Sequence, residues 1–243
     1  MFVSDTAYDS FMGRFSTRLA PLFADFAGVG RGDRVVDVGA GTGALTDELL
    51  GRGAHVAAAE PSAAFVASLH RGFPGVDARE AGAEELPWPD ASFDAALAQL
   101  VITFMRDAPA GLREMRRVVR PGGTVAVCMW DGDGMEMLAA VNRTRDALGH
   151  AREERLYRTR SSIEELVGDG VESELLEVDA PYADFEDFWH ALAGGVGPAG
   201  VWVASLDDEG RARARAELRR QLGEPEGPFA LTGRAWAARA TRA

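Results

Sequence analysis

An acidic residue followed by three alternating glycines is the part of this sequence best suited to bind a charged ligand. Asp37 lies in the apolar run 35–38, and residues 39–43 read Gly-Ala-Gly-Thr-Gly. The glycines permit a tight turn and allow a ligand to approach the backbone. The helical pattern at 44–50 would add unpaired backbone N–H groups and the positive end of a helix dipole. The stretch predicts a strand, a turn and a helix that together bind a small ligand.

The chemistry of Asp37 helps to decide which ligand this is. Gly39, Gly41 and Ala44 also satisfy the G-x-G-x-x-A pattern of dinucleotide-binding turns. A carboxylate just before the turn is a poor neighbour for a pyrophosphate, whereas it suits a ligand with a positive end, such as an α-amino group or a sulfonium. S-adenosylmethionine carries both groups. The alternative is a glycine turn that serves only to pack the strand against the helix.

A second acid, Glu60, favours a ligand that contains adenosine. The apolar run 54–59 predicts a buried strand that ends at Glu60. This acid stands near the offset of about 20 residues at which nucleotide-binding folds place a carboxylate against the ribose hydroxyls. Nicotinamide enzymes share the feature, so Glu60 does not identify the nucleotide, and a solvated acid at a strand end is the alternative. Pro61 follows, and then Ser62 as the expected N-cap of the next helix.

Two later segments complete a recognisable pattern. Residues 81–94 (AGAEELPWPDASFD) follow an expected third strand at 76–81, and residues 120–123 (RPGG) precede the apolar run 124–130. Together with the acid–glycine turn, these segments resemble the class I S-adenosylmethionine-dependent methyltransferases, in particular the ubiquinone/menaquinone-type branch. The resemblance extends over residues 8–131. It implies an α/β fold with a doubly wound, Rossmann-like sheet of seven strands in the order 3-2-1-4-5-7-6, with strand 7 antiparallel.

Other parts of the chain supply the elements that would position these residues. Amphipathic spacing predicts a helical region at 5–28, and an apolar run predicts a fourth strand at 93–101. The carboxyl end of that strand would lie beside the first strand, where doubly wound sheets bind their ligands. Further elements that we expect are helices at 107–119, 135–148 and 163–167, the last capped by Ser162, a loop at 131–134, and strands at 172–180 and 228–238.

The resemblance also implies how the cofactor would be held. Residues 8–14 are similar to a segment that covers the cofactor in many small methyltransferases. The alternative, a helix that only packs against the sheet, is equally compatible with the sequence. Ala83 and Glu84 would border the adenine, where relatives often carry Asp at the position of Gly82. The predicted cofactor-binding residues are Tyr8, Met12, Arg14, Asp37, Gly39, Ala40, Gly41, Gly43, Glu60, Pro61, Ser62, Ala83, Glu84, Gln99 and Leu100.

The end of the fourth strand offers no evident catalytic base. Gln99 and Leu100 would face the methionine part of the cofactor, mostly through their backbones, unless Gln99 is an ordinary strand-end residue. Relatives often have a histidine near Thr103, so this chain does not support a histidine base there. His190 and Asp131 remain as catalytic candidates on their location alone.

We expect a single methyltransferase domain over residues 1–243, with an N-terminal helical cover at 1–30 and an inserted substrate lid at 181–226. Aromatic residues beside the glycine-rich stretch 194–200 suit such a lid. Ordinary packing of these aromatics under a loop is the alternative.

Composition narrows the functional class. The chain has 243 residues, 47% of them hydrophobic, and a net charge of −12, which is unlike the basic footprint of a nucleic-acid-binding protein. The four histidines lack metal-ligand spacing, so no metal is expected. Cys128 is the single cysteine and allows no internal disulfide. The sequence shows no signal-peptide pattern, and its longest apolar stretch, 95–105, is too short to span a bilayer, so we expect a cytoplasmic protein without membrane partners.

These observations favour an S-adenosylmethionine-dependent methyltransferase that acts on a small-molecule acceptor by in-line displacement. One alternative is a regulator that binds S-adenosylmethionine without turning it over. A nicotinamide-dependent oxidoreductase is another, which Asp37 and the segment 81–94 disfavour. The acceptor, the atom methylated and the oligomeric state stay open.

Overall fold

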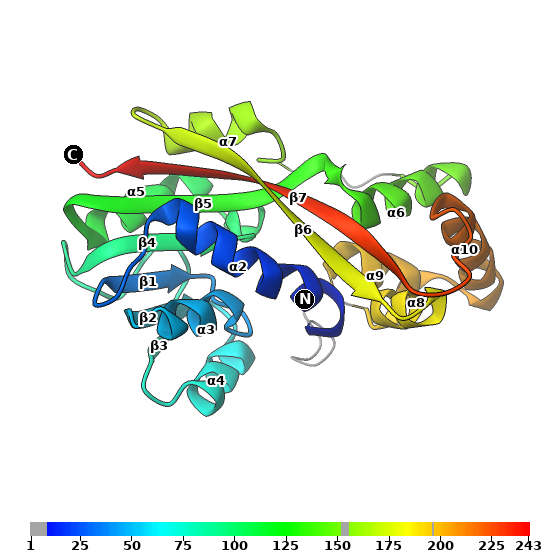
Figure 1. The fold of residues 1–243 in the computed structure, drawn as a ribbon, viewed down its shortest axis with the longest axis horizontal. Helices are drawn as coiled ribbons and strands as arrows, with labels where there is room; N and C mark the ends of the chain where they lie inside the picture. The colour runs from blue at the N-terminus through cyan, green and yellow to red at the C-terminus, as the bar shows by residue number, and fades with distance from the viewer. Residues whose placement is uncertain (1–8, 152–155, 196) are drawn as a thin grey trace. The chain divides into compact units, whose positions relative to one another are not determined.

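The structure, a computed structural model, divides into two compact units that the chain enters more than once (Figure 1). The residues described are 9–151, 156–195 and 197–243. What we call the sheet unit comprises residues 16–131, 156–176 and 235–243. What we call the helical unit comprises residues 9–15, 132–151, 177–195 and 197–234. Whether residues 1–30 cover a cofactor and 181–226 cover a substrate stays a prediction.

Seven strands form the sheet. They are β1 (Arg34–Val38), β2 (His55–Glu60), β3 (Asp77–Glu80), β4 (Phe93–Gln99), β5 (Val119–Met135), β6 (Glu172–Tyr182) and β7 (Phe229–Thr241). Their order is β3-β2-β1-β4-β5-β7-β6, as predicted. The pairs from β3 to β5 are parallel. β7 is antiparallel to β5, because Gly122 N–H donates to Arg242 O and Arg242 N–H donates to Gly123 O, both at 2.8 Å. The predicted α/β sheet is therefore confirmed.

Buried strands explain why the sequence pattern was informative. In β1 and β2 every residue after the first is buried. Parallel strands covered on both faces read as continuous apolar runs, which is the pattern the sequence shows. Asp37 and Glu60 are the exceptions in these two runs, and both are buried with their strands. Two buried carboxylates in one small region require an explanation beyond packing.

Helices flank the strands of the sheet unit. They are α2 (Arg14–Ala27), which follows a π-helical turn η1 (Asp9–Gly13), α3 (Ala44–Gly51), α4 (Ala63–Gly72), α5 (Ala108–Val118) and α7 (Arg160–Val167), with a short 3₁₀ turn η2 (Ile102–Phe104). Figure 1 shows α2 in front of the central strands and α5 behind them. Asp107 caps α5 by accepting the Ala110 N–H at 2.8 Å.

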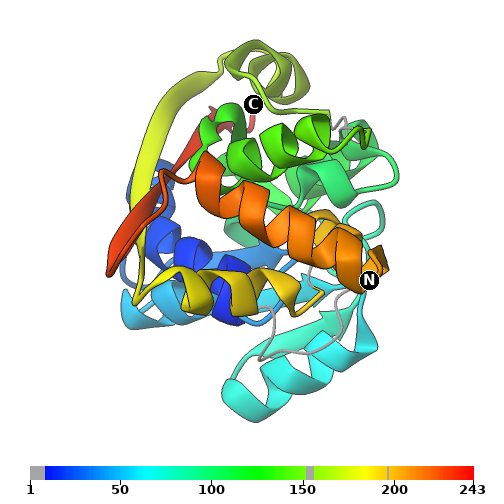
Figure 2. The same cartoon turned by 90° about the vertical axis from the view of Figure 1, so that its right-hand side faces the viewer.

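Four helices make up most of the helical unit. They are α6 (Glu136–Ala147), α8 (Phe185–Ala193), α9 (Gly197–Ser205) and α10 (Asp208–Gln221). Helices α6 and α10 lie side by side (Figure 2). Tyr182 packs edge-on against Phe188 and stacks on Phe229, with ring centroids 5.2 and 5.4 Å apart. Tyr182 and Phe188 are buried, so these aromatic residues of the predicted lid form a small core.

Three local predictions were wrong. Thr159, not Ser162, caps α7, and its hydroxyl accepts the Ser162 N–H. Residues 131–134 are not a loop, because β5 continues to Met135. The 120–123 turn lies inside the bounds of β5, where the register with β4 jumps. Gly123 is needed there, since an added Cβ would lie 2.4 Å from Asp94 O.

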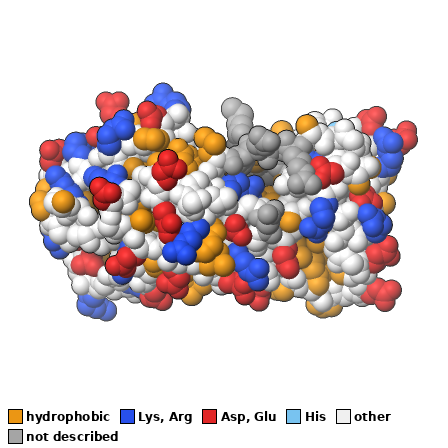
Figure 3. Space-filling model, turned by 90° about the horizontal axis from the view of Figure 1, so that it is seen from above, with side chains coloured by type: hydrophobic (Ala, Val, Ile, Leu, Met, Phe, Trp, Pro, Cys, Tyr) orange, Lys and Arg blue, Asp and Glu red, His pale blue; other side chains and the backbone are white. Residues whose placement is uncertain are grey.

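Basic and acidic side chains are interspersed on the face shown in Figure 3. All 26 basic residues are arginines. On the face shown in Figure 3, arginine side chains lie among Asp and Glu side chains. Pairs such as Arg160 with Glu164 and Arg234 with Glu177 join them, with N–O distances of 2.7 and 2.6 Å. Exposed pairs of this kind contribute little stability.

Candidate cofactor site

The glycine turn between β1 and α3 is packed on two sides and open on the third. Gly39, Gly41 and Gly43 all have positive φ, of 77°, 56° and 95°. An added Cβ would lie 2.8 Å from a methyl group of Val101 at the first position and 2.4 Å from the Phe73 ring at the third. At Gly41, nothing among the described atoms lies within 4 Å. Among the described residues, the turn therefore leaves space beside its middle glycine, while the contact of Gly41 with a cofactor stays a prediction.

Backbone hydrogen bonds hold this turn against the end of β2. The N–H groups of Gly39 and Ala40 both donate to Ala59 O, at 2.7 and 3.2 Å. Gly41 N–H donates to Glu60 Oε2 at 3.0 Å. The predicted residues Ala40 and Gly41 are thus fixed by the strand that carries the second acid.

Asp37 is a buried carboxylate with no cationic partner among the described residues. Its side chain is 1% exposed, and Thr46 Oγ1 on α3 donates to Asp37 Oδ2 at 2.7 Å. Burial raises the pKa of Asp37 to about 7; the Thr46 hydrogen bond opposes this shift, and the nearby charge of Glu60 adds to it. Within the described part of the chain, no Arg or His forms an ion pair with Asp37. A ligand with a positive end would compensate this group.

Glu60 joins the turn to the next helix. Its Oε1 accepts the Ser62 N–H at 2.9 Å, while Oε2 is held by Gly41. Burial raises the pKa of Glu60, and these two backbone hydrogen bonds partly offset the rise. A carboxylate has about four lone-pair positions, so Glu60 keeps capacity for ribose hydroxyls. Pro61 is exposed, and Ser62 precedes α4 as predicted, but the Ser62 side chain accepts no capping hydrogen bond from the described residues.

The segment after β3 carries Ala83, which is buried, and Glu84. Glu84 Oε1 accepts the N–H groups of Arg106 and Asp107 at 2.7 and 3.1 Å. A Cβ added at Gly82 would lie 2.9 Å from Glu84 Oε2. The Glu84 carboxylate therefore stands beside the position at which relatives often carry Asp.

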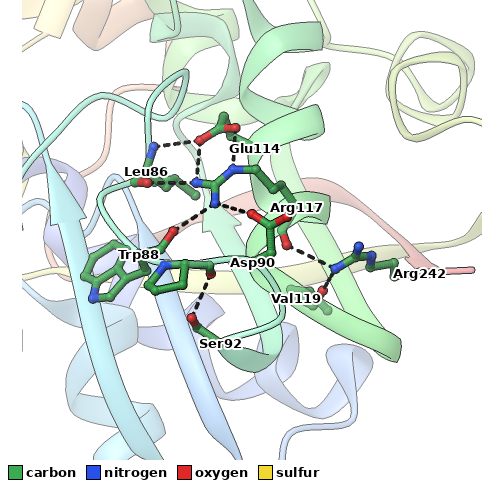
Figure 4. A network of polar contacts seen from close by, with 9 residues as sticks. Leu86, Trp88, Asp90, Ser92, Glu114, Arg117, Val119 and Arg242 are labelled. Carbon is green, nitrogen blue, oxygen red and sulfur yellow. Dashed lines mark hydrogen bonds and ion pairs between the residues drawn. The ribbon is translucent and has the colours of Figure 1, made fainter.

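Arg117 on α5 holds residues 86–90 of the segment after β3 through hydrogen bonds (Figure 4). Its guanidinium donates to the carbonyl oxygens of Leu86 and Trp88, both at 2.9 Å, and to Asp90 Oδ1 at 2.8 Å. Glu114 accepts two further bonds from it, at 2.7 and 2.8 Å. These carboxylates raise the pKa of Arg117, so the guanidinium stays charged. One side chain thus fixes a long loop that has little secondary structure of its own.

The end of β4 holds two unusual features. Gln99 Nε2 donates to Ser16 O on α2 at 3.1 Å, while Gln99 Oε1 and Ser16 Oγ are buried without partners among the described residues. Leu100 has φ of 63°, a left-handed conformation that is rare for a residue with a side chain. Its N–H donates to Cys128 O at 2.9 Å. Strained backbone and orphaned polar atoms concentrate at functional sites.

Other predicted residues belong to the helical unit. Arg14 forms a two-pronged ion pair with Asp187, at 2.8 and 2.5 Å, and lies 4.8 Å from the centre of the Tyr182 ring. Met12 is half-buried in η1, and His190 is exposed on α8. Tyr8 lies outside the described residues. Asp131, the other catalytic candidate, is half-buried in β5 and belongs to the sheet unit. The catalytic roles of His190 and Asp131 stay predictions.

Sequence reasoning missed Thr46, Ser16 and Arg117. Thr46 stands among the apolar residues of a short helix that follows a glycine turn, which is a weak signal for a buried polar contact. The contact of Ser16 with Gln99 and the contacts of Arg117 with the loop gave no local signal, because these partners lie far away in the sequence.

Residues 36–127 match the family model described as "Methyltransferase domain". These residues are therefore similar to a methyltransferase domain. The matched segment lies within the sheet unit and contains the candidate residues from Asp37 to Leu100. The class I methyltransferase family generally uses S-adenosylmethionine. No group of three or more His, Cys, Asp or Glu side chains in the described chain is arranged to hold a metal ion. None of the helices described is long and apolar enough to cross a membrane.

Known proteins resemble parts of this chain. A demethylmenaquinone methyltransferase of Mycobacterium sp. (strain KMS) is 43% identical over 102 residues, which are 42% of this chain and 43% of that protein. The chain spans about half the length of the curated relatives it matches. A candidate type II methyltransferase of Anaeromyxobacter dehalogenans has a similar fold, with a TM-score of 0.65 and 23% identity over 91% of this chain and 95% of that one. The [4+2]-cyclase SpnF also shares the fold, with a TM-score of 0.55 and 23% identity over 90% of this chain and 80% of that one.

Proposed function

We propose that this protein is a methyltransferase that uses S-adenosylmethionine to methylate a small molecule. The observation that carries the proposal is Asp37, a buried carboxylate with no cation among the described residues, next to a turn that is open above Gly41. A cationic ligand fits this arrangement better than a pyrophosphate does. The match of residues 36–127 to a methyltransferase domain supports the same cofactor.

Each part of the cofactor has a set of residues suited to it. Asp37 would meet the α-amino end, and Glu60 would accept hydrogen bonds from the ribose hydroxyls. Glu84 Oε2 and the backbone at Ala83 would border the adenine. Arg117 would serve this subsite indirectly, by holding the loop that carries it. When bound, S-adenosylmethionine supplies an activated methyl group, so the protein has little covalent chemistry to perform.

The protein's main task in this proposal is to position the acceptor and exclude water. Orientation of this kind contributes about 7–11 kcal/mol toward lowering a reaction barrier. A base is required only if the acceptor must lose a proton. His190 and Asp131 are the residues that we would test for that role.

The acceptor is proposed as a small molecule other than nucleic acid. The net charge of −12 supports this choice, since a phosphate backbone would be repelled. The similar mycobacterial protein is named for demethylmenaquinone, so a lipophilic quinol is the first acceptor to try. A cytoplasmic location is part of the same proposal.

A ligand-binding screen tests the cofactor. We would measure the melting temperature with S-adenosylmethionine, S-adenosylhomocysteine, NAD and NADP, because a ligand that binds the native state raises it. Asp37→Asn and Glu60→Gln should abolish the rise given by the first two ligands. The exposed acids Asp47 and Glu80 provide matched controls as Asp47→Asn and Glu80→Gln, which should keep it. A rise with NAD or NADP alone would overturn the proposal.

A second assay separates an enzyme from a binding protein. Transfer of a labelled methyl group to a panel of small acceptors, beginning with demethylated quinols, should give a methylated product. Tight cofactor binding without transfer to any acceptor in the panel would count against an enzyme and favour a regulator.

A further inference from the structure

Thr46 places a buried hydroxyl group directly on the Asp37 carboxylate. It lies near the start of α3, is 0% exposed, and its Oγ1 is 2.7 Å from Asp37 Oδ2. Its helical neighbours Leu45 and Leu49 are buried and apolar. A valine would fill nearly the same space without a polar group to desolvate, so packing alone does not call for a hydroxyl here.

The surroundings of Asp37 make this contact important. The groups that can titrate near it are Glu60 on β2 and Cys128 on β5, and neither supplies a positive charge. Burial raises the pKa of Cys128, so its thiol stays neutral. In the part of the chain that is described, Thr46 is the residue that stabilises the charged form of Asp37, through its hydroxyl and its backbone N–H.

We infer that Thr46 is a positioning residue that fixes the orientation of the Asp37 carboxylate and favours its charged form for a cationic ligand group. For the identity of that ligand, the inference rests on the proposed function. Asp37 and Thr46 lie on either side of the glycine turn, on β1 and α3. The bond between them therefore also ties the two ends of the turn together.

Removing the hydroxyl should change how Asp37 titrates. A hydrogen bond to the charged form of an acid lowers its pKa, so its loss moves the titration midpoint upward. A bond to a charged group typically corresponds to a shift of about one pKa unit. From a starting pKa of about 7, such a shift reduces the ionised fraction at pH 7 from about one half to about one tenth. Cofactor affinity at pH 7 should then fall about fivefold and recover at higher pH.

The experiment follows Asp37 with and without ligand. The ¹³C shift of the Asp37 carboxyl carbon, assigned with Asp37→Asn, is titrated in the ligand-free protein for the wild type, Thr46→Val and Thr46→Ser. S-adenosylhomocysteine affinity is then measured from pH 6 to pH 9 for the same proteins. Thr144→Val is a matched control, because Thr144 is equally buried but its hydroxyl donates to Ala140 O within α6.

The expected result is an upward shift of the Asp37 midpoint in Thr46→Val, a parallel shift of the binding profile, and wild-type behaviour in Thr46→Ser. An unchanged midpoint in a folded Thr46→Val protein overturns the inference; if that variant does not fold, Thr46→Ala decides in its place. If the midpoint shifts but the wild type binds neither S-adenosylmethionine nor S-adenosylhomocysteine, the proposed function fails while the positioning role of Thr46 stands.

Discussion

Replacing Asp37 with asparagine should make the ligand-free protein more stable at alkaline pH while it removes cofactor binding. Burial is the main cause that raises the pKa of Asp37 from 3.8 to about 7. Because the folded pKa lies above the unfolded one, the folded state holds more protons between about pH 4 and pH 7. The contribution of this group to the free energy of unfolding therefore falls as the pH rises through that window.

The size of the change in unfolding free energy follows from the pKa shift of Asp37. Each pKa unit corresponds to about 1.36 kcal/mol, so ionised Asp37 lowers the free energy of unfolding by about 4 kcal/mol at pH 8. At pH 5 the penalty is smaller by about 2.5 kcal/mol, because the folded carboxyl is still protonated. Asparagine keeps the shape and an oxygen for the Thr46 hydroxyl, so the variant should escape this penalty.

Urea unfolding at pH 5 and pH 8 measures the difference. The stability gap between Asp37→Asn and the wild type should widen by about 2.5 kcal/mol toward pH 8. The exposed Asp47 on the neighbouring helix gives the control variant Asp47→Asn. Its difference from the wild type in free energy of unfolding should change by no more than a few tenths of a kcal/mol between the two pH values. A gap for Asp37→Asn that is equal at the two pH values would refute the argument that burial of a charge dominates at this position.

Three further predictions concern the framework around the site. Gly39→Ala should lose about 1–2 kcal/mol in urea unfolding, because its φ is positive and the new methyl meets Val101; unchanged stability would contradict this packing. Arg117→Met should lose about 2 kcal/mol and speed amide hydrogen exchange at residues 86–91, since its partners there are carbonyl and carboxylate oxygens; unchanged exchange would count against the loop anchor. A double-mutant cycle with Arg14→Met and Asp187→Asn should give a coupling of about 1 kcal/mol that weakens with salt; zero coupling at low salt would refute an energetic role for the pair.

The sheet and the glycine turn could be predicted because their signals are local. β1 and β2 are short apolar runs, and each ends in a glycine turn or an acid. A continuous apolar run is the pattern typical of a buried parallel strand. The positions of Asp37 and Glu60 at the strand ends follow from the same runs. The strand order came from the resemblance, because nothing in the local sequence of β6 or β7 fixes which neighbour each strand pairs with.

Contacts between distant segments could not be predicted. Gln99 is one example, because its side chain donates to Ser16 O, which is far away in the sequence. The expected backbone role of Gln99 toward the cofactor stays a prediction. The expected loop at 131–134 is part of β5, although its aspartates and glycines disfavour strands. Tertiary pairing overrides local propensity in such places. Glu84 shows the same limit, since only the fold reveals that its carboxylate accepts the N–H groups of Arg106 and Asp107.

Three departures from ordinary folding rules lie at the ends of two neighbouring strands. Asp37 is a buried acid without a cation among the described residues, Leu100 has left-handed backbone, and Gln99 Oε1 is an orphaned acceptor in the same described part. All three lie in the last residues of β1 and β4 or directly after them, and these strands are paired in the sheet. A fold selected for stability alone would remove each of them, as Asp37→Asn would do for the first. Their position at the ends of two paired strands, beside the turn at Gly41, is consistent with a binding site for a charged ligand.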